Sequence, residues 1–196
     1  MKRKVVILTA FALVALLVAG GTMAWFTGTA RANIEYKAGT IKVEVNNGLK
    51  GLKQNTYLNP GDCFKGDITF KNTGNKRAYL RVKLTSIWEG TQEDANTDNV
   101  AKYDILKKQK KSGNRYETYW VEKEGWWYYT KILQPGAETK PIINKLCFDE
   151  SKMDNKFQNA KFELKVDAEA IQVTHKAYKN ADGWNGLPYE VERPQN

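Results

Sequence analysis

Apolar and polar residues alternate along much of this chain with a period of two, which is typical of half-buried β-strands. In the first such run, Ile41, Val43 and Val45 alternate with charged residues. Further alternating or apolar runs occupy residues 64–71, 79–87, 116–121, 126–133, 142–148 and 162–173. Clusters of Gly, Asn and Pro separate these runs. The pattern predicts an all-β protein, an antiparallel jelly roll or β-sandwich built from two sheets.

Turn signals between the runs refine this prediction. Residues 122–125, between two of the aromatic runs, predict a β-hairpin. Pro-Gly turns occur at 58–62 and at 133–138, each ahead of a predicted strand. Proline presets φ at the first corner of such a turn, and glycine accepts the positive φ of the second. We expect these two turns to lie at the same rim of the sandwich.

The N-terminus has the pattern of a signal peptide. A basic start, Lys2 to Lys4, precedes an apolar run over 5–19, and small residues precede a predicted cut between Ala24 and Trp25. An uncleaved N-terminal anchor is the alternative, although the apolar run is shorter than the roughly 20 residues that span a bilayer. We therefore expect a secreted protein of the cell surface or extracellular matrix, with no stable membrane span after cleavage.

The predicted organisation has four parts. Residues 1–24 form the signal peptide, 25–36 an N-terminal segment, 37–176 the β-sandwich domain, and 177–196 a C-terminal tail. The tail has no periodicity and is expected to be loose, with Trp184 as the residue best able to dock on the body.

The chain is basic, with a formal net charge of +9 that falls to +6 once the three basic residues of the leader are removed. Such a charge favours non-specific association with anionic cell-wall polymers or extracellular DNA. No recognition motif accompanies it, so specific nucleic-acid binding is not expected. The basic run 107–111 is expected to be an exposed hairpin end or loop. The acidic stretch 92–102 lacks the spacing of an EF-hand and is expected to be a solvated loop.

Cys63 and Cys147 are the two cysteines of the chain. Export would allow one intramolecular disulfide between them, because the extracellular environment is oxidising. Two buried, reduced thiols that act as small apolar side chains are the alternative. The sequence leaves both states open.

Motifs for catalysis are missing from the sequence. His175 is the single histidine, so the H-E-x-x-H motif of zinc peptidases is absent. A Ser-His-Asp arrangement would also need His175, and no serine lies in a nucleophile-elbow motif. We therefore expect no enzyme activity, no catalytic residues, no cofactor and no bound metal.

Aromatic residues are crowded into the segment 120–129. On a strand, Trp126 and Tyr128 face one way and Trp127 and Tyr129 face the other. One pair must fill the core, and the other could form an exposed aromatic surface suited to sugars or protein partners. That both faces are covered is the alternative. A glycan-binding surface at Trp126 or Trp127 is accordingly one candidate function.

Three parts of the chain together resemble the TasA/camelysin family of secreted biofilm-fibre proteins. Residues 21–27, Gly-Thr-Met-Ala-Trp-Phe-Thr, resemble the signal-peptide end of proteins cut by the SipW-type signal peptidase of Gram-positive bacteria. Residues 38–43, 58–62 and 68–74 are similar to the first part of the family's domain, and 168–172 to its final strand. The middle of the chain, 88–154, does not align.

The resemblance implies a jelly-roll subunit of extracellular biofilm fibres, with itself or a homologous subunit as partner and a SipW-type signal peptidase as processing enzyme. In that family the freed N-terminal segment is donated as a strand to the next subunit. Here this would be 25–36, with Trp25, Phe26 and Ile34 as anchors. Backbone pairing with a sheet edge would hold the donated strand, and head-to-tail donation makes open filaments. A leader that is disordered or folds onto its own subunit is the alternative.

Camelysin-type members have been labelled metalloendopeptidases. No zinc motif in this sequence receives that label, so no catalytic residue is transferred. A secreted, non-catalytic matrix or fibre subunit is the function expected from the sequence, and a surface metalloendopeptidase or a glycan-binding module are the competing functions.

Overall fold

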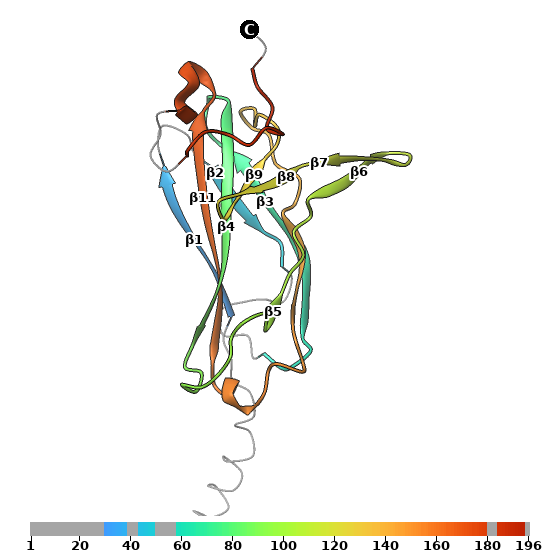
Figure 1. Cartoon of the computed structure of the whole chain (residues 1–196), viewed down its shortest axis with the longest axis vertical. Helices are drawn as coiled ribbons and strands as arrows, with labels where there is room; N and C mark the ends of the chain where they lie inside the picture. The colour runs from blue at the N-terminus through green and yellow to red at the C-terminus, as the bar shows by residue number, and fades with distance from the viewer. Residues whose placement is uncertain (1–29, 39–42, 50–57, 180–183, 195–196) are drawn as a thin grey trace, which may run out of the picture.

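The structure, a computed structural model, describes residues 30–38, 43–49, 58–179 and 184–194 and consists almost entirely of β-strands (Figure 1). A five-stranded sheet has the order β1-β11-β4-β9-β8, and a four-stranded sheet has the order β2-β3-β10-β5. The strands of the first sheet are β1 (Ala30–Ala38), β11 (Lys161–Gln172), β4 (Ala78–Glu89), β9 (Trp126–Tyr129) and β8 (Trp120–Lys123). Those of the second are β2 (Val43–Asn47), β3 (Cys63–Asn72), β10 (Ile143–Phe148) and β5 (Ala101–Lys102). The predicted all-β sandwich is confirmed.

Three short elements lie outside the two sheets. Strands β6 (Lys108–Ser112) and β7 (Arg115–Thr118) form a separate two-stranded hairpin that projects sideways from the body (Figure 1). Two 3₁₀ helices, η1 (Asn155–Phe157) and η2 (Thr174–Lys179), flank β11 in sequence. In the described part of the chain, no helix is long and apolar enough to cross a membrane. The predicted signal peptide, 1–24, lies outside the described residues.

The main core lies between the two sheets, and β11 shows how the alternating pattern builds it. Phe162, Leu164 and Val166 are buried against the opposite sheet, while the intervening charged residues are partly exposed on the outer face. Strand β11 pairs along its whole length with β4 in antiparallel register. The second sheet contributes buried side chains from β3 and β10, namely Ile68, Phe70, Ile143, Leu146 and Phe148.

A second, smaller core covers the outer face of the first sheet. Trp184, Leu187 and Val191, from the C-terminal segment, are buried there with Tyr79 of β4 and Tyr128 of β9. The expectation of a loose tail over 177–196 therefore differs from the structure for the described residues 184–194. The reason is visible in β4, where residues 78–82 are all buried because both faces of the strand are covered.

The predicted hairpin about residues 122–125 is confirmed. Strands β8 and β9 pair from Trp120↔Tyr129 to Lys123↔Trp126. Glu124 and Gly125 both have positive φ, 54° and 77°, as the two central residues of a type I′ turn require. The backbone N–H of Gly125 donates to the Glu122 side chain at 2.7 Å, which closes the turn.

The two Pro-Gly turns lie at opposite ends of β3, so the prediction of a shared rim is wrong. The N–H of Gly61, before β3 begins, donates to the carbonyl of Phe148 at 3.0 Å. The N–H of Gly136 donates to the carbonyl of Asn72, at the end of β3, at 2.8 Å. Each turn does precede its strand as predicted. Because β3 and β10 are antiparallel neighbours, the turns that lead into them must face opposite ways.

Candidate functional site

Strand β1 forms one edge of the five-stranded sheet and pairs with β11 in parallel, from Ala30↔Phe162 to Ala38↔Ala170. Every other strand pair in the described chain is antiparallel. Residues 30–36 of the expected donor segment therefore lie in the sheet of their own chain, which is the alternative that the sequence left open. Ile34 lies opposite Val166, whereas Trp25 and Phe26 lie outside the described residues.

The β11 edge would be exposed without β1. Nine residues of β1 pair with β11, while the next strand in the chain, β2, belongs to the opposite sheet. Unpaired backbone groups along such an edge are a template for pairing with another chain. The β11 edge therefore needs a partner strand. A β1 strand has the sequence that pairs with this edge, whether it comes from the same chain or from another copy.

Cys63 and Cys147 form a disulfide, with their Cα atoms 4.1 Å apart. They are directly opposite each other on the antiparallel neighbours β3 and β10. The bridge thus links two strands that are 84 residues apart in sequence. Both sulfur atoms are used in the bond, so neither thiol is available as a metal ligand.

The aromatic segment does not form an exposed strip. Trp127 packs against the main core, and Trp126 packs against the second core under the C-terminal segment. Both indoles are half-buried. The structure thus matches the alternative in which both faces of β9 are covered, and an exposed aromatic surface at Trp126 and Trp127 is not present.

Arg81 of β4 is held in an aromatic clamp that sequence reasoning missed. Its guanidinium carbon lies 4.4 Å from the ring centre of Trp126 and 4.6 Å from that of Trp184. Its Nε and Nη2 donate to Glu169 of β11 at 2.9 and 2.6 Å, and its Nη1 donates to the Tyr128 hydroxyl at 3.2 Å. The strand pattern placed Arg81 on the solvent face; the C-terminal segment then covers that face.

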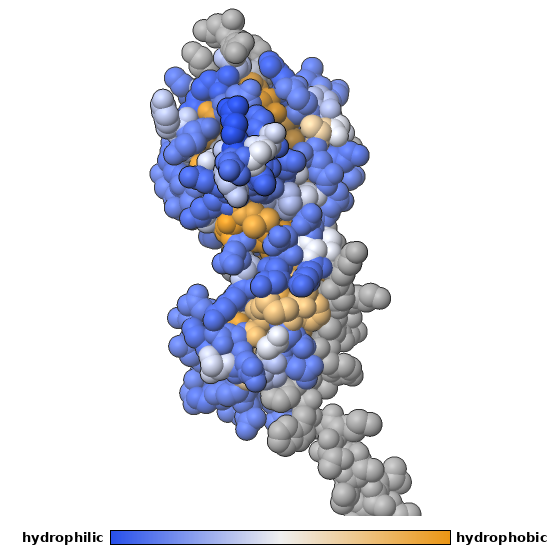
Figure 2. Space-filling view, turned by 90° about the vertical axis from the view of Figure 1, so that its right-hand side faces the viewer, coloured by the Kyte–Doolittle hydropathy of each residue, from blue (hydrophilic) through white to orange (hydrophobic). Residues whose placement is uncertain are grey.

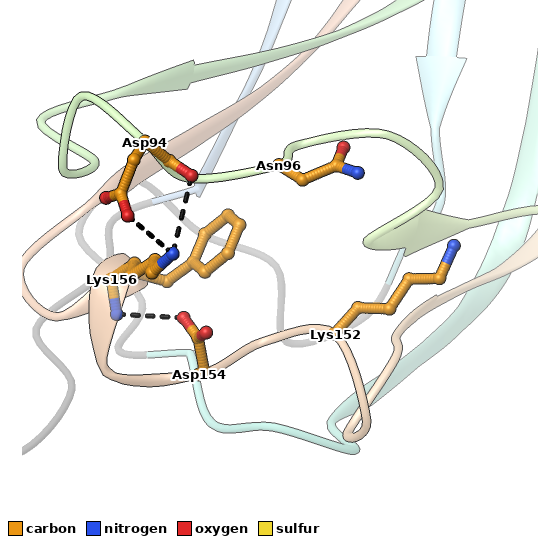
Figure 3. Close-up of a pocket in the computed structure, with 6 residues that line it drawn as sticks. Asp94, Asn96, Lys152, Asp154 and Lys156 are labelled. Carbon is orange, nitrogen blue, oxygen red and sulfur yellow. Dashed lines mark hydrogen bonds and ion pairs between the residues drawn. The ribbon is translucent and has the colours of Figure 1, made fainter.

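The acidic stretch 92–102 borders a shallow pocket of about 180 Å³ (Figure 3). Lys156 points across it to Asp94, with Nζ 2.7 Å from a carboxylate oxygen. The hydrogen bond from Lys156 lowers the pKa of Asp94, and the same contact raises the pKa of Lys156. Asp154 accepts from the Lys156 backbone N–H at 2.9 Å, and Phe157 forms an apolar part of the lining.

Both lysines that line this pocket are thus already engaged by the acidic loop, Lys156 through its ion pair with Asp94. Lys152, also in the lining, donates to the carbonyl of Asp98 at 3.3 Å. A calcium ion would have to displace these ammonium groups from the acidic loop. The expectation of a solvated loop fits this arrangement better than a cation site does.

The described residues do not fit a catalytic metal. Zinc peptidases hold their ion with three protein ligands, most of them histidine or carboxylate. Among the residues that the structure describes, no group of three or more His, Cys, Asp or Glu side chains converges to hold a metal. His175 lies in η2, and its side chain is not among those that the structure describes. No catalytic step can be derived from these groups.

Residues 1–114 match the model of a family described as camelysin metallo-endopeptidases, which agrees with the resemblance found in the sequence. No curated protein and no solved structure matches the chain.

The family description contradicts the expectation that the chain is not an enzyme, because it names a metallo-endopeptidase. That expectation relied on the single histidine of the chain and on the absence of contiguous motifs such as H-E-x-x-H. Metal ligands can also come from separate elements, so a missing contiguous motif does not decide the question.

Proposed function

This chain belongs to the camelysin metallo-endopeptidase family of surface or secreted proteins, and we propose that it assembles into extracellular matrix fibres by exchanging β1 between subunits. In the single chain, β1 completes its own β11 edge. In a fibre, the β1 of one subunit would occupy the β11 edge of the next. The observation that carries the proposal is the parallel pairing of β1 at that edge.

The geometry supports such an exchange. Within its sheet, β1 bonds to β11 alone, so its departure breaks no other strand pair among those described. A β1 from another copy would make the same backbone hydrogen bonds, because its sequence and register are the same. Donation from each subunit to the next is a head-to-tail contact that does not close, so it produces filaments. The predicted cut after Ala24 would free the N-terminus for this step.

Exchange can be tested with cysteines at a register pair of β1 and β11. Arg31 lies opposite Glu163, and neighbouring strands are about 5 Å apart, within reach of a disulfide. One variant carries Arg31→Cys and a second carries Glu163→Cys. After the two are mixed under assembly conditions and oxidised, we expect a covalent heterodimer on a non-reducing gel, because β1 of one copy lies on β11 of the other.

The matched control uses Asp167→Cys in place of Glu163→Cys. Asp167 lies opposite Glu35, which is four residues, or about 13 Å, along β1 from Arg31. This mixture should give little covalent dimer. A chain carrying both Arg31→Cys and Glu163→Cys, oxidised as a monomer, should be locked and unable to form filaments. If the locked monomer polymerises as well as the unmodified protein, β1 exchange is not the assembly mechanism.

Peptidase activity is the second candidate function, and the family description is the observation that favours it. The protein loaded with zinc should then bind the metal stoichiometrically and cleave casein, and a chelator should abolish the cleavage. Protein that retains no zinc after dialysis and leaves casein intact would exclude this candidate. The fibre role and a peptidase role are compatible, so each is judged by its own assay.

A further inference from the structure

The hairpin of β6 and β7 stands apart from both sheets and extends sideways from the body (Figure 1). Seen end-on, the surface at its position is strongly hydrophilic (Figure 2). The basic run 107–111, predicted as an exposed hairpin end or loop, supplies most of β6. A projecting element of this kind adds little to the core of the protein, so the side chains that do not attach it to the body are available for contacts with other molecules.

The base of the hairpin is firmly anchored. The Gln109 side chain donates to the carbonyl of Pro141 at 2.9 Å, and the N–H of Tyr119 donates to the carbonyl of Lys107 at 2.8 Å. The Thr130 hydroxyl donates to the carbonyl of Thr118 at 2.7 Å. These bonds hold the arm at a defined angle to the body.

One face of the hairpin has compensated charges. Glu117 lies between Lys131, at 2.5 Å, and Lys111, at 3.2 Å, and accepts from the Tyr119 hydroxyl at 2.9 Å. Gln109 lies directly opposite Glu117 on the same face. This face therefore serves to attach the arm to the body.

The other face is basic and aromatic. Lys110 lies directly opposite Tyr116. Lys108 lies two residues before Lys110 on the same face, about 7 Å along the strand. Neither lysine is within salt-bridge distance of a carboxylate of the described residues. The Tyr116 side chain is 66% exposed, one of two large apolar side chains left exposed in the described chain.

We propose that this face, the Lys108–Lys110–Tyr116 face, binds single-stranded nucleic acid without sequence preference. The two ammonium groups would contact successive phosphates, and the phenol ring would stack on a base between them. Proteins that bind single strands combine a positive track with aromatic rings in this way. The exposed tyrosine favours a polyanion that carries planar bases over a phosphodiester polymer without them, such as a wall polymer.

Binding is measured by fluorescence anisotropy with a labelled oligothymidylate of fifteen nucleotides, over a series of salt concentrations. For single strands, the slope of log K against log salt is about −0.7 per phosphate contact. The double variant that carries Lys108→Gln and Lys110→Gln should therefore have a slope that is shallower by about 1.4. Tyr116→Ala should weaken binding about tenfold, whereas Tyr116→Phe should retain it.

The matched control is Lys65→Gln with Lys145→Gln, two exposed lysines that lie opposite each other on β3 and β10. It has the same net charge change as the hairpin variant and should leave the slope nearly unchanged. An equal loss of slope in both double variants would overturn the proposal, because it would show that diffuse charge does the binding.

A second arm uses an abasic oligonucleotide of the same length. It should bind about tenfold more weakly than the oligothymidylate and should not respond to Tyr116→Ala. Equal affinity for both oligonucleotides, with Tyr116→Ala silent, would overturn the proposal in favour of a base-free polyanion. Because the hairpin is a separate sheet, this result does not depend on whether β1 is exchanged.

Discussion

Arg81 lies on β4 at a position where the alternation of the strand directs it away from the main core, yet it is only 3% exposed. Its charge is tolerated there because Glu169 and Tyr128 accept its hydrogen bonds and two indole rings cover its faces. These groups come from β9, from β11 and from the C-terminal segment. The clamp thereby connects β4, β9, β11 and the C-terminal segment.

We expect Arg81→Met to destabilise the protein by about 2–4 kcal/mol. The substitution preserves much of the packing volume but leaves the Glu169 carboxylate without its counter-charge, and breaking a largely buried pair from one side is costly. Lys83→Met is the matched control, since Lys83 is exposed and lies two residues along the same strand face; it should cost less than about 0.5 kcal/mol. Urea unfolding measures both, and equal costs would contradict the role of the clamp.

Glu117 provides a pH-dependent contribution to stability. Hydrogen bonds from Lys131, Tyr119 and Lys111 hold the pKa of Glu117 at about 2, below its ordinary value of 4.5. A carboxylate whose pKa is lower in the folded state stabilises the protein above its unfolded pKa. That contribution is lost as pH falls from about 4.5 towards about 2.

Glu117→Gln should therefore reduce stability at pH 7 and flatten the loss of stability on acidification. The urea midpoint of the variant should approach that of the unmodified protein near pH 2. Glu190→Gln, at an exposed position on the C-terminal segment, should follow the unmodified protein across the range. A Glu117→Gln curve parallel to the unmodified one would show that the interactions of Glu117 do not depend on its charge.

At the scale of elements, the disulfide joins β3 to β10 near the end where β3 begins. Closing a loop of 84 residues restricts the unfolded chain. The chain-entropy model assigns such a loop about 4.6 kcal/mol of stabilisation.

We expect the double substitution of Cys63→Ser and Cys147→Ser to lower the free energy of unfolding by up to about 4.6 kcal/mol. A reducing agent should bring the unmodified protein to the same urea midpoint and should leave the double variant unaffected. An unchanged midpoint on reduction would mean that the bridge is not formed in the protein or does not constrain its unfolded state.

At the scale of the whole molecule, the proposed exchange of β1 would turn single chains, in which β1 pairs with β11, into an assembly. The double substitution Trp25→Ser with Phe26→Ser should leave the monomer folded and stop filament formation, because it removes the anchors expected at the start of the donated segment. Thr27→Ala with Thr29→Ala, in the same segment, is the control and should still assemble. Filaments of the Trp25→Ser, Phe26→Ser variant in electron micrographs would refute strand donation.

The sequence alone determined the elements that depend on neighbouring residues. Alternation with a period of two predicted β3, β4, β10 and β11 to within a few residues, because each face of a strand meets one environment. The break at 122–125 between two strand-like runs predicted the hairpin, and the structure places the positive φ of its turn at Glu124 and Gly125. The family resemblance was also readable, because it lies in contiguous segments, and the match over 1–114 confirms it.

Only the tertiary structure decided which elements meet. The opposite placement of the two Pro-Gly turns follows from the antiparallel pairing of β3 with β10, and the disulfide from their register. Arg81 and Trp126 are covered because the C-terminal segment returns over the first sheet. Strand β1 pairs with β11, more than 130 residues away in sequence. Such contacts depend on the free energy of the whole fold, which no local pattern records.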